Sequence, residues 1–264
     1  MIDATWPGAV LGPFGECISF VGDELAIAGC TKRALTTLEY MPKVLAHLVQ
    51  LLEQNGADTS TIRQLIWESP DSWAVSERQT GYLKIHQHSF LAMWGAIEAA
   101  IEKQFVLLLC NEADAYDGIR QFLGKSVPRP AAVADENTAR SLFQVAKHKL
   151  NGSYRFAESS RIMFKLIGTP LSLDAKYDEV LNEAKEVRNC IAHRGGQIDA
   201  KAVARVPSLA GFLGQRFQVT AVIFDSYNKA IEAFMLAASN DAIKFATAKL
   251  LPNVPTNSVG TNGA

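Results

Sequence analysis

Apolar residues recur at intervals of three and four along most of the chain, which is the spacing of one face of an α-helix. The strongest signal covers residues 82–111, YLKIHQHSFLAMWGAIEAAIEKQFVLLLCN. Similar patterns predict helices near 24–52, 138–165, 174–194 and 216–251. We therefore expect an all-α protein in which the 82–111 helix is central.

Interruptions of this pattern indicate where helices bend or end. Pro42 should kink or divide the first segment, because proline lacks the N–H that an interior helical turn uses. Gly195 and Gly196 should end the helix that Asp174 caps, since glycine readily adopts the left-handed C-cap conformation. Prolines and small residues predict an excursion from the core within 112–137.

The predicted helices divide the chain into three segments. Residues 1–75 are predicted to form an N-terminal helical extension, and residues 76–251 a helical bundle with mostly antiparallel neighbours. Residues 252–264, PNVPTNSVGTNGA, are expected to form a flexible tail.

Composition narrows the class of protein. The chain has 264 residues, of which 48% are hydrophobic and 20% charged, and its net charge is -1, as in a globular protein with a substantial core. Contact with nucleic acid therefore requires a local basic patch. The sequence has four cysteines without a CxxC pair, no signal-peptide pattern and no run of about 18 apolar residues. We expect a cytoplasmic protein with no membrane partner.

No metal site is predicted from the sequence. His86 and His88 would point about 200° apart in a helix. Neither histidine has an acidic or cysteine partner at ligand spacing.

The segment EVRNCIAHRGGQ, residues 186–197, carries the candidate chemistry. Projection at about 100° per residue places Arg188 inside the apolar arc of its helix, where a charge needs a partner. Glu98 is the corresponding carboxylate on the stripe of the 82–111 helix, so we predict that Glu98 and Arg188 pair. The alternative is that both lie at the margins of their stripes and reach water.

Asn189 and His193 share a helix face that excludes Arg188. Bringing all three side chains to one site requires either a distorted helix end or a second subunit related by a two-fold axis. His193 lies in the last helical turn, where the helix dipole favours imidazolium and Arg194 opposes it. The alternative role for His193 is structural, as a cap of the helix C-terminus.

The sequence Arg188-Asn189-Cys190-Ile191-Ala192-His193 resembles the Arg-Asn-three residues-His signature of the HEPN superfamily, the higher eukaryote and prokaryote nucleotide-binding domains. The preceding predicted helix with Glu98 is similar to the acidic first helix of many members. The resemblance covers about residues 80–250.

This resemblance implies an up-down four-helix bundle that forms a homodimer. It also implies a metal-independent endoribonuclease without a cofactor, acting in a toxin–antitoxin or defence system with RNA and an antitoxin or other protein as partners. Arg188 and His193 would be the catalytic residues, with Asn189 and Glu98 in support. Other members are inactive, so the alternative is a silent helical scaffold that binds a protein or nucleotide.

A basic stretch gives a second candidate surface for RNA. Basic residues outnumber acidic ones between Arg140 and Lys165, and Tyr154 and Phe156 are interleaved with them. The alternative is an ordinary solvated helix face. The residues predicted to bind RNA are Lys147, Lys149, Arg155, Arg161 and, beside His193, Arg194.

Overall fold

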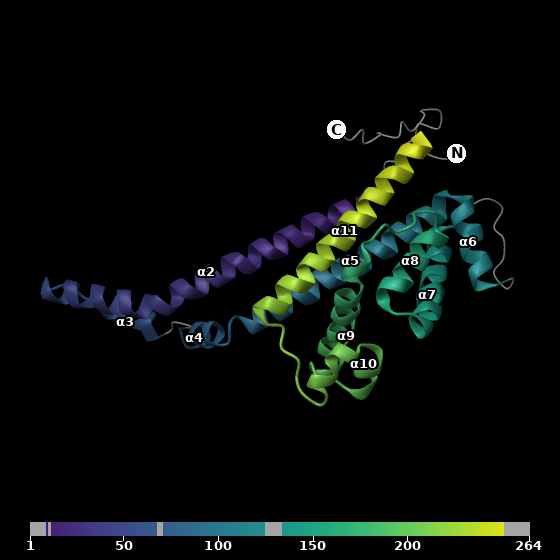
Figure 1. Ribbon diagram of the computed structural model, residues 1–264. Coiled ribbons are helices and arrows are strands. Elements are labelled where there is room, and N and C mark those ends of the chain that lie inside the picture. Colours follow the sequence, from purple (N-terminus) through teal and green to yellow (C-terminus); the bar gives the residue numbers. More distant parts are fainter. Residues whose placement is uncertain (1–8, 10–11, 68–70, 125–133, 251–264) are drawn as a thin grey trace, which may run out of the picture. The chain divides into compact units, whose positions relative to one another are not determined.

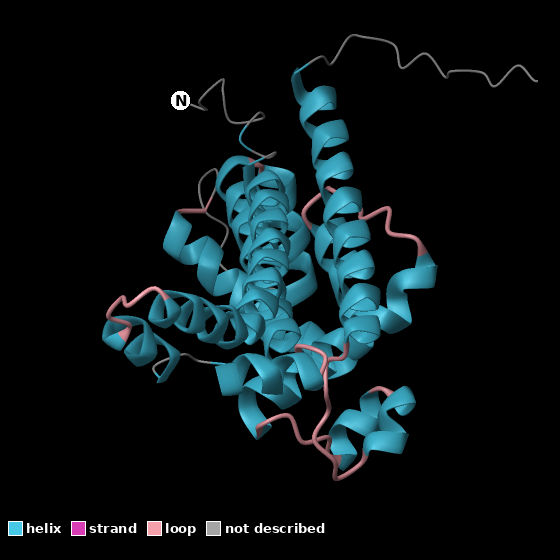
Figure 2. Cartoon of the chain, turned by 90° about the vertical axis from the view of Figure 1, so that its left-hand side faces the viewer, coloured by secondary structure: helices cyan, strands magenta, loops and turns pink. Residues whose placement is uncertain are grey.

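Helices form nearly all of the described structure. The computed structural model describes residues 9, 12–67, 71–124 and 134–250. Within these ranges there is no β-strand (Figure 2), and the sheet-like contacts are two isolated bridges, Gln197–Arg216 and Ile198–Leu213. The predicted all-α fold class is confirmed.

Figure 1 shows the helices in chain order. They are α2 (Gly12–Gln54), α3 (Ser60–Trp67), α4 (Asp71–Gln79), α5 (Leu83–Asn111), α6 (Ala113–Leu123), α7 (Glu136–Ser153), α8 (Phe156–Leu166), η1 (Ala175–Tyr177), α9 (Asp178–Arg194), α10 (Ala200–Arg205), η2 (Pro207–Phe212) and α11 (Ala221–Leu250).

Most predicted helices occur, with changed bounds. The predicted 82–111 helix is α5, and α2 continues through Pro42 as one helix. The single helix predicted over 138–165 is wrong, because extended backbone at Tyr154 and Arg155 divides it into α7 and α8.

The two predictions of non-helical segments, the 112–137 excursion and the C-terminal tail, fall partly or wholly outside the described residues. The excursion predicted within 112–137 contains α6, although residues 125–133 lie outside the described part of the chain. The predicted tail, 252–264, lies outside it as well.

The chain packs as two compact units, and neither is continuous in sequence. Unit 1 comprises Met1–Cys17, Glu98–Lys176 and Ala233–Ala264, and unit 2 comprises Ile18–Ile97 and Tyr177–Glu232. Three of the four boundaries fall inside α2, α5 and α11, so each of these helices contributes residues to both units, and the fourth falls inside η1. The specific four-helix HEPN-like bundle and the 1–75 extension stay predictions.

Aromatic side chains from distant parts of the sequence form much of the unit 1 core. Phe14, at the start of α2, is fully buried, and its ring centroid lies 5.9 Å from that of Phe164 and 6.5 Å from that of Phe234. Phe105 of α5 packs edge-on against Phe143 of α7 at 5.2 Å. Burial of one such side chain stabilises the fold by about 2–3 kcal/mol.

The core of unit 2 joins the first half of α5 to the first half of α11. Phe90 packs against Tyr227 with ring centroids 5.0 Å apart, and His86 stacks on Phe224 at the same separation. The α9 helix buries an apolar face in this unit, as its periodicity predicts. The buried members of that face are Leu181, Ala184, Val187, Cys190 and Ile191.

His86 is a neutral histidine in this core. Its ring is buried, and neither ring nitrogen has a hydrogen-bond partner among the described residues. Burial, together with the positive charge of Lys32, lowers the pKa of His86 to about 4. Below the ordinary pKa of histidine, the unfolded chain therefore binds a proton at His86 that the folded protein does not bind.

Acidification should reveal this difference as a loss of stability. Between pH 6.5 and about 4, the His86 contribution to the free energy of unfolding should fall by at most about 1.4 kcal/mol per pH unit, because only the unfolded chain gains the proton. His86→Phe should remove this part of the pH dependence. Denaturant unfolding of both proteins at pH 7 and pH 5 measures it, and equal losses in the two proteins would contradict the prediction.

Candidate active site

The end of α9 brings together the motif residues of unit 2 and a capping arginine. Gly195 has φ 59° and Gly196 has φ 89°, both left-handed, and the Gly196 N–H donates to the Cys190 carbonyl at 2.9 Å. The helix therefore stops where the sequence predicts. Arg216 completes the cap, because its Nε donates to the Gly195 carbonyl at 2.7 Å.

His193 does not fill that capping role. Its side chain is exposed, and within the described ranges it has no hydrogen-bond or ion-pair partner. The Gly195 carbonyl instead accepts from Arg216, which is 21 positions away in the sequence. The structural alternative for His193, a cap of its own helix, thus loses its support, and the imidazole is accessible to a ligand.

Arg188 and Asn189 form a side-chain pair on α9. Arg188 Nη1 donates to Asn189 Oδ1 at 3.1 Å, and both residues are half-buried. A guanidinium that donates to a neighbouring amide has fewer orientations open to it, which suits a group that must meet a phosphate at a defined position. Asn189 therefore has a geometric reason to support Arg188.

The predicted partner of Arg188 belongs to the other unit. Glu98 lies in unit 1, where Lys147 Nζ approaches its carboxylate at 3.9 Å, whereas Arg188 lies in unit 2. The Glu98–Arg188 pair stays a prediction.

Two buried or partly buried carboxylates of α9 fix the elements around the site. Glu186 is buried and accepts from Arg205 Nη1 of α10 at 3.0 Å. Glu183 accepts from the Tyr227 hydroxyl of α11 at 2.9 Å. Burial and the neighbouring Glu183 carboxylate raise the pKa of Tyr227, so this hydroxyl stays a proton donor. These carboxylates therefore have structural partners.

Arg194 is held beside the helix end by an acidic residue. Its Nη1 lies 2.8 Å from Asp199 Oδ1, and the same aspartate caps α10 by accepting from the Ala202 N–H. Arg194 is still about one-third exposed at its side chain. It can therefore contact an anion from the position in which the structure holds it.

The surroundings of the motif are basic, although the whole chain is nearly neutral. Residues 188–216 contain five arginines and lysines, against Asp199 as the one acidic residue. A local surplus of this kind attracts a polyanion whatever the total charge is. Arg216 was missed by sequence analysis, because its GQRFQ surroundings match no phosphate-binding motif. Its position next to Gly195 arises only from tertiary contacts.

The other residues predicted to bind RNA lie in unit 1 and have contacts there. Lys149 Nζ donates to the Phe122 carbonyl at 2.7 Å, and Arg161 Nη2 donates to the Leu173 carbonyl at 3.1 Å. Lys147 approaches Glu98, and Arg155 occupies the N-cap position of α8. These contacts favour the structural alternative for this stretch, whose role in RNA binding stays a prediction.

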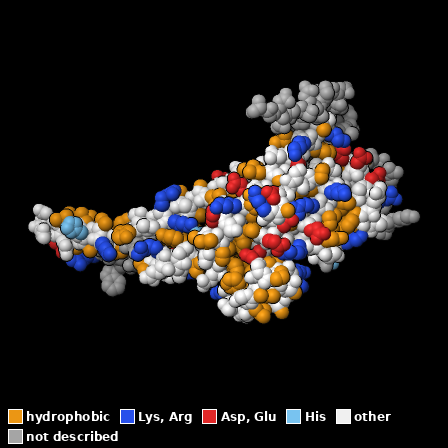
Figure 3. Space-filling view, in the orientation of Figure 1, with side chains coloured by type: hydrophobic (Ala, Val, Ile, Leu, Met, Phe, Trp, Pro, Cys, Tyr) orange, Lys and Arg blue, Asp and Glu red, His pale blue; other side chains and the backbone are white. Residues whose placement is uncertain are grey.

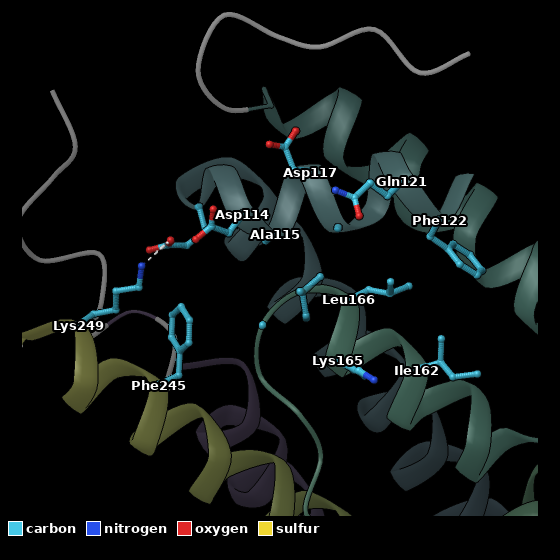
Figure 4. A pocket seen from close by; sticks show the side chains of 14 residues that line it. Asp114, Ala115, Asp117, Gln121, Phe122, Ile162, Lys165, Leu166, Phe245 and Lys249 are labelled. Atoms are coloured by element: carbon cyan, nitrogen blue, oxygen red, sulfur yellow. Dashed lines mark hydrogen bonds and ion pairs between the residues drawn. The ribbon is translucent and has the colours of Figure 1, made fainter. Parts of the chain in front are cut away.

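A separate cavity lies within unit 1, between α6, α8 and α11 (Figure 4). Its volume is about 940 Å³. Asp114, Asp117 and Gln121 line the α6 side, and Lys249 at the rim pairs with Glu112 at 2.8 Å. No residue of the α9 motif lines it, so it is not part of the candidate active site.

In the part of the chain that the structure describes, no helix is long and apolar enough to cross a membrane. No cluster of three or more histidine, cysteine, aspartate or glutamate side chains with metal-binding geometry occurs in those ranges.

Comparison with known proteins returns no relative. No protein-family model, curated protein or solved structure matches the chain. The resemblance to the HEPN superfamily therefore rests on the motif that ends α9.

Proposed function

We propose that the protein is a metal-independent endoribonuclease of the HEPN type, with His193 and Arg188 as catalytic residues. The observation that carries this proposal is the state of His193. The imidazole is exposed, has no hydrogen-bond or ion-pair partner in the described structure, and lies in a basic segment. Its exposure leaves the imidazole accessible to a ligand, and its place in the Arg-Asn-three residues-His motif distinguishes it from other exposed histidines such as His88.

The chemistry needs few groups because RNA supplies its own nucleophile. His193 would transfer protons at the 2′-hydroxyl and the leaving oxygen, and Arg188 would stabilise the charge that develops on the phosphorus oxygens. Asn189 would hold the Arg188 guanidinium through their 3.1 Å hydrogen bond. Attack of the 2′-oxygen on phosphorus would break the bond to the 5′-oxygen and leave a 2′,3′-cyclic phosphate and a 5′-hydroxyl.

A homodimer would complete this site. Arg188 and His193 are five positions apart, so on a straight helix their side chains diverge by about 140°. A two-fold axis near Gly195 would pair each His193 with its counterpart and bring both copies of Arg188 and His193 around one cleft. Sedimentation equilibrium at micromolar concentration should therefore give twice the chain mass of 28.8 kDa. A monomer at that concentration would argue against the composite site.

The function itself is tested by incubating single-stranded RNA with the full chain in EDTA. We expect cleavage with 2′,3′-cyclic phosphate ends, which T4 polynucleotide kinase converts to 3′-hydroxyls before electrophoresis. Products with a 5′-phosphate, or cleavage that EDTA abolishes, would contradict the proposed chemistry. Intact RNA would favour the rival function.

The rival function is a catalytically silent scaffold that binds a protein such as an antitoxin. One observation favours it. The second half of α2, in unit 2, exposes large apolar side chains on one face, within an arc of about 80°. These residues are Tyr40, Val44, Leu48 and Leu51. A partner helix could bury such a stripe, and an enzyme of the proposed type could also use it to bind an inhibitor protein.

A further inference from the structure

A second element joins the site at the end of α9: residues 211–217, GFLGQRF, which are the last two residues of η2 and the loop that follows it. This loop carries one exposed aromatic side chain, Phe212, and one exposed guanidinium, Arg216. Figure 3 shows hydrophobic side chains at the surface of the lobe that α10 and η2 form. The motif from Arg188 to His193 contains neither of these residues.

Backbone hydrogen bonds tie the loop to the turn after α9. The Ile198 N–H donates to the Gln215 carbonyl at 3.0 Å, and the Gly214 N–H donates back to the Ile198 carbonyl at 2.8 Å. The Phe217 N–H donates to the Gly196 carbonyl at 2.9 Å. The loop therefore has a fixed position relative to the helix end that carries His193.

Gly196 allows the close approach that this arrangement needs. A Cβ atom at this position would lie 3.2 Å from Arg216 Cγ, which is tighter than an ordinary contact, and the backbone is left-handed there. The aliphatic part of Arg216 thus lies against the Gly196 backbone. Its Nε is used by the Gly195 carbonyl, and the described structure provides no acid partner for the rest of the guanidinium.

The Phe212 ring packs against a buried aromatic ring and is partly exposed to solvent. Its ring packs edge-on against Phe217 with centroids 4.9 Å apart and an interplanar angle of 67°. Phe217 is buried at 2% exposure, whereas Phe212 is 40% exposed. A partly exposed aromatic ring on a fixed loop that also carries an arginine is an arrangement with which proteins stack unpaired bases and bind the adjoining phosphates.

We propose that Phe212 stacks an unpaired base of single-stranded RNA while Arg216 and Arg194 bind the flanking phosphates. This inference rests on the proposed function, since it places the substrate at the same helix end. It also sets the substrate class, because bases inside a duplex are stacked on one another and offer no free face to Phe212. Phe212 is a binding and positioning residue; proton transfer belongs to His193.

The test measures binding without cleavage. A fluorescent 2′-O-methyl oligonucleotide cannot be cut, because it lacks the free 2′-hydroxyl, and its anisotropy reports Kd for the full chain. Phe212→Ala should raise Kd about 10-fold or more, whereas Phe212→Trp should bind like the wild type. Leu213→Ala, which removes an exposed apolar side chain from the same loop, is the matched control and should change Kd less than about 2-fold.

Two further measurements separate base stacking from other roles. The duplex form of the oligonucleotide should bind about 10-fold more weakly than the single strand. Quenching of tryptophan fluorescence in Phe212→Trp, beyond that of the wild type, should accompany binding of the single strand. Equal Kd values for Phe212→Ala and the wild type, or for duplex and single strand, would overturn the inference.

The outcomes also separate this inference from the proposed function. If ordinary RNA stays intact but Phe212→Ala weakens oligonucleotide binding, the base-stacking role stands and the nuclease proposal fails. If RNA is cleaved but Phe212→Ala binds normally, the nuclease proposal stands and this inference fails. Absence of binding to any oligonucleotide by the wild type overturns the inference and directs attention to a protein partner for this surface.

Discussion

Replacement of His193 by alanine should lower the rate of RNA cleavage at least about 100-fold, because a positioned acid–base group typically contributes about 10²- to 10⁴-fold. The fold should not change, since the exposed imidazole contacts no hydrogen-bonding group within the described ranges. Initial cleavage rates in EDTA, measured on one single-stranded substrate at several pH values, test the expected loss of activity. Thermal unfolding of both proteins tests whether the fold is unchanged.

His88→Ala is the matched control for this variant. His88 is also an exposed histidine on a helix, but it lies on α5, outside both the motif and the basic stretch from Arg140 to Lys165. Its removal should leave the cleavage rate within about 2-fold of the wild type. Equal losses in the two variants, or full activity in His193→Ala, would remove His193 from the mechanism.

Substitution of Gly118 by alanine should lower the free energy of unfolding by about 1–3 kcal/mol, the usual cost of overpacking a close contact. Gly118 lies on α6, and a Cβ atom there would collide with the backbone carbonyl oxygen of Leu166 on α8. A backbone atom cannot rotate away as a side chain can, so the two helices would have to separate. Denaturant unfolding measures the loss.

Gly95→Ala should have the opposite effect on the free energy of unfolding. Gly95 is exposed inside α5, and nothing lies within 4 Å of its added Cβ. Alanine should therefore raise the free energy of unfolding by about 0.5–1 kcal/mol, because it restricts the unfolded backbone and suits a helix better than glycine. If Gly118→Ala raised the free energy of unfolding as Gly95→Ala does, the contact between Gly118 and the Leu166 carbonyl would not be tight.

Local signals explain why some elements could be predicted from the sequence. The α5 helix was visible because its apolar periodicity is long and uninterrupted, and α9 ends as predicted because only the Gly195-Gly196 backbone takes the left-handed turn easily. The predicted apolar face of α9 was also mostly right, since Leu181, Ala184 and Val187 are fully buried.

The missed features depend on tertiary contacts. The start of α2 at Gly12 was hidden by glycines of low helix propensity, and burial of Phe14 in unit 1 outweighs that preference. The break between α7 and α8 follows Gly152 and Ser153, a weak signal within a continuous apolar pattern. The position of the loop that carries Phe212 and Arg216 could not be predicted, because it is joined to the turn after α9 by backbone hydrogen bonds that leave no local pattern in the sequence.

The interleaved sequence of the two units has a consequence for synthesis on the ribosome. Cys17 donates to the Met235 sulfur at 3.3 Å in the buried core of unit 1, across 218 positions. Phe14 likewise packs against Phe234. The nascent chain cannot close this core until α11 has emerged, so the usual N-terminal-first, domain-by-domain folding during translation is not open to unit 1. Apolar residues near the N-terminal end of unit 1, such as Phe14, therefore stay unburied or bound to a chaperone until the last described helix has been synthesised.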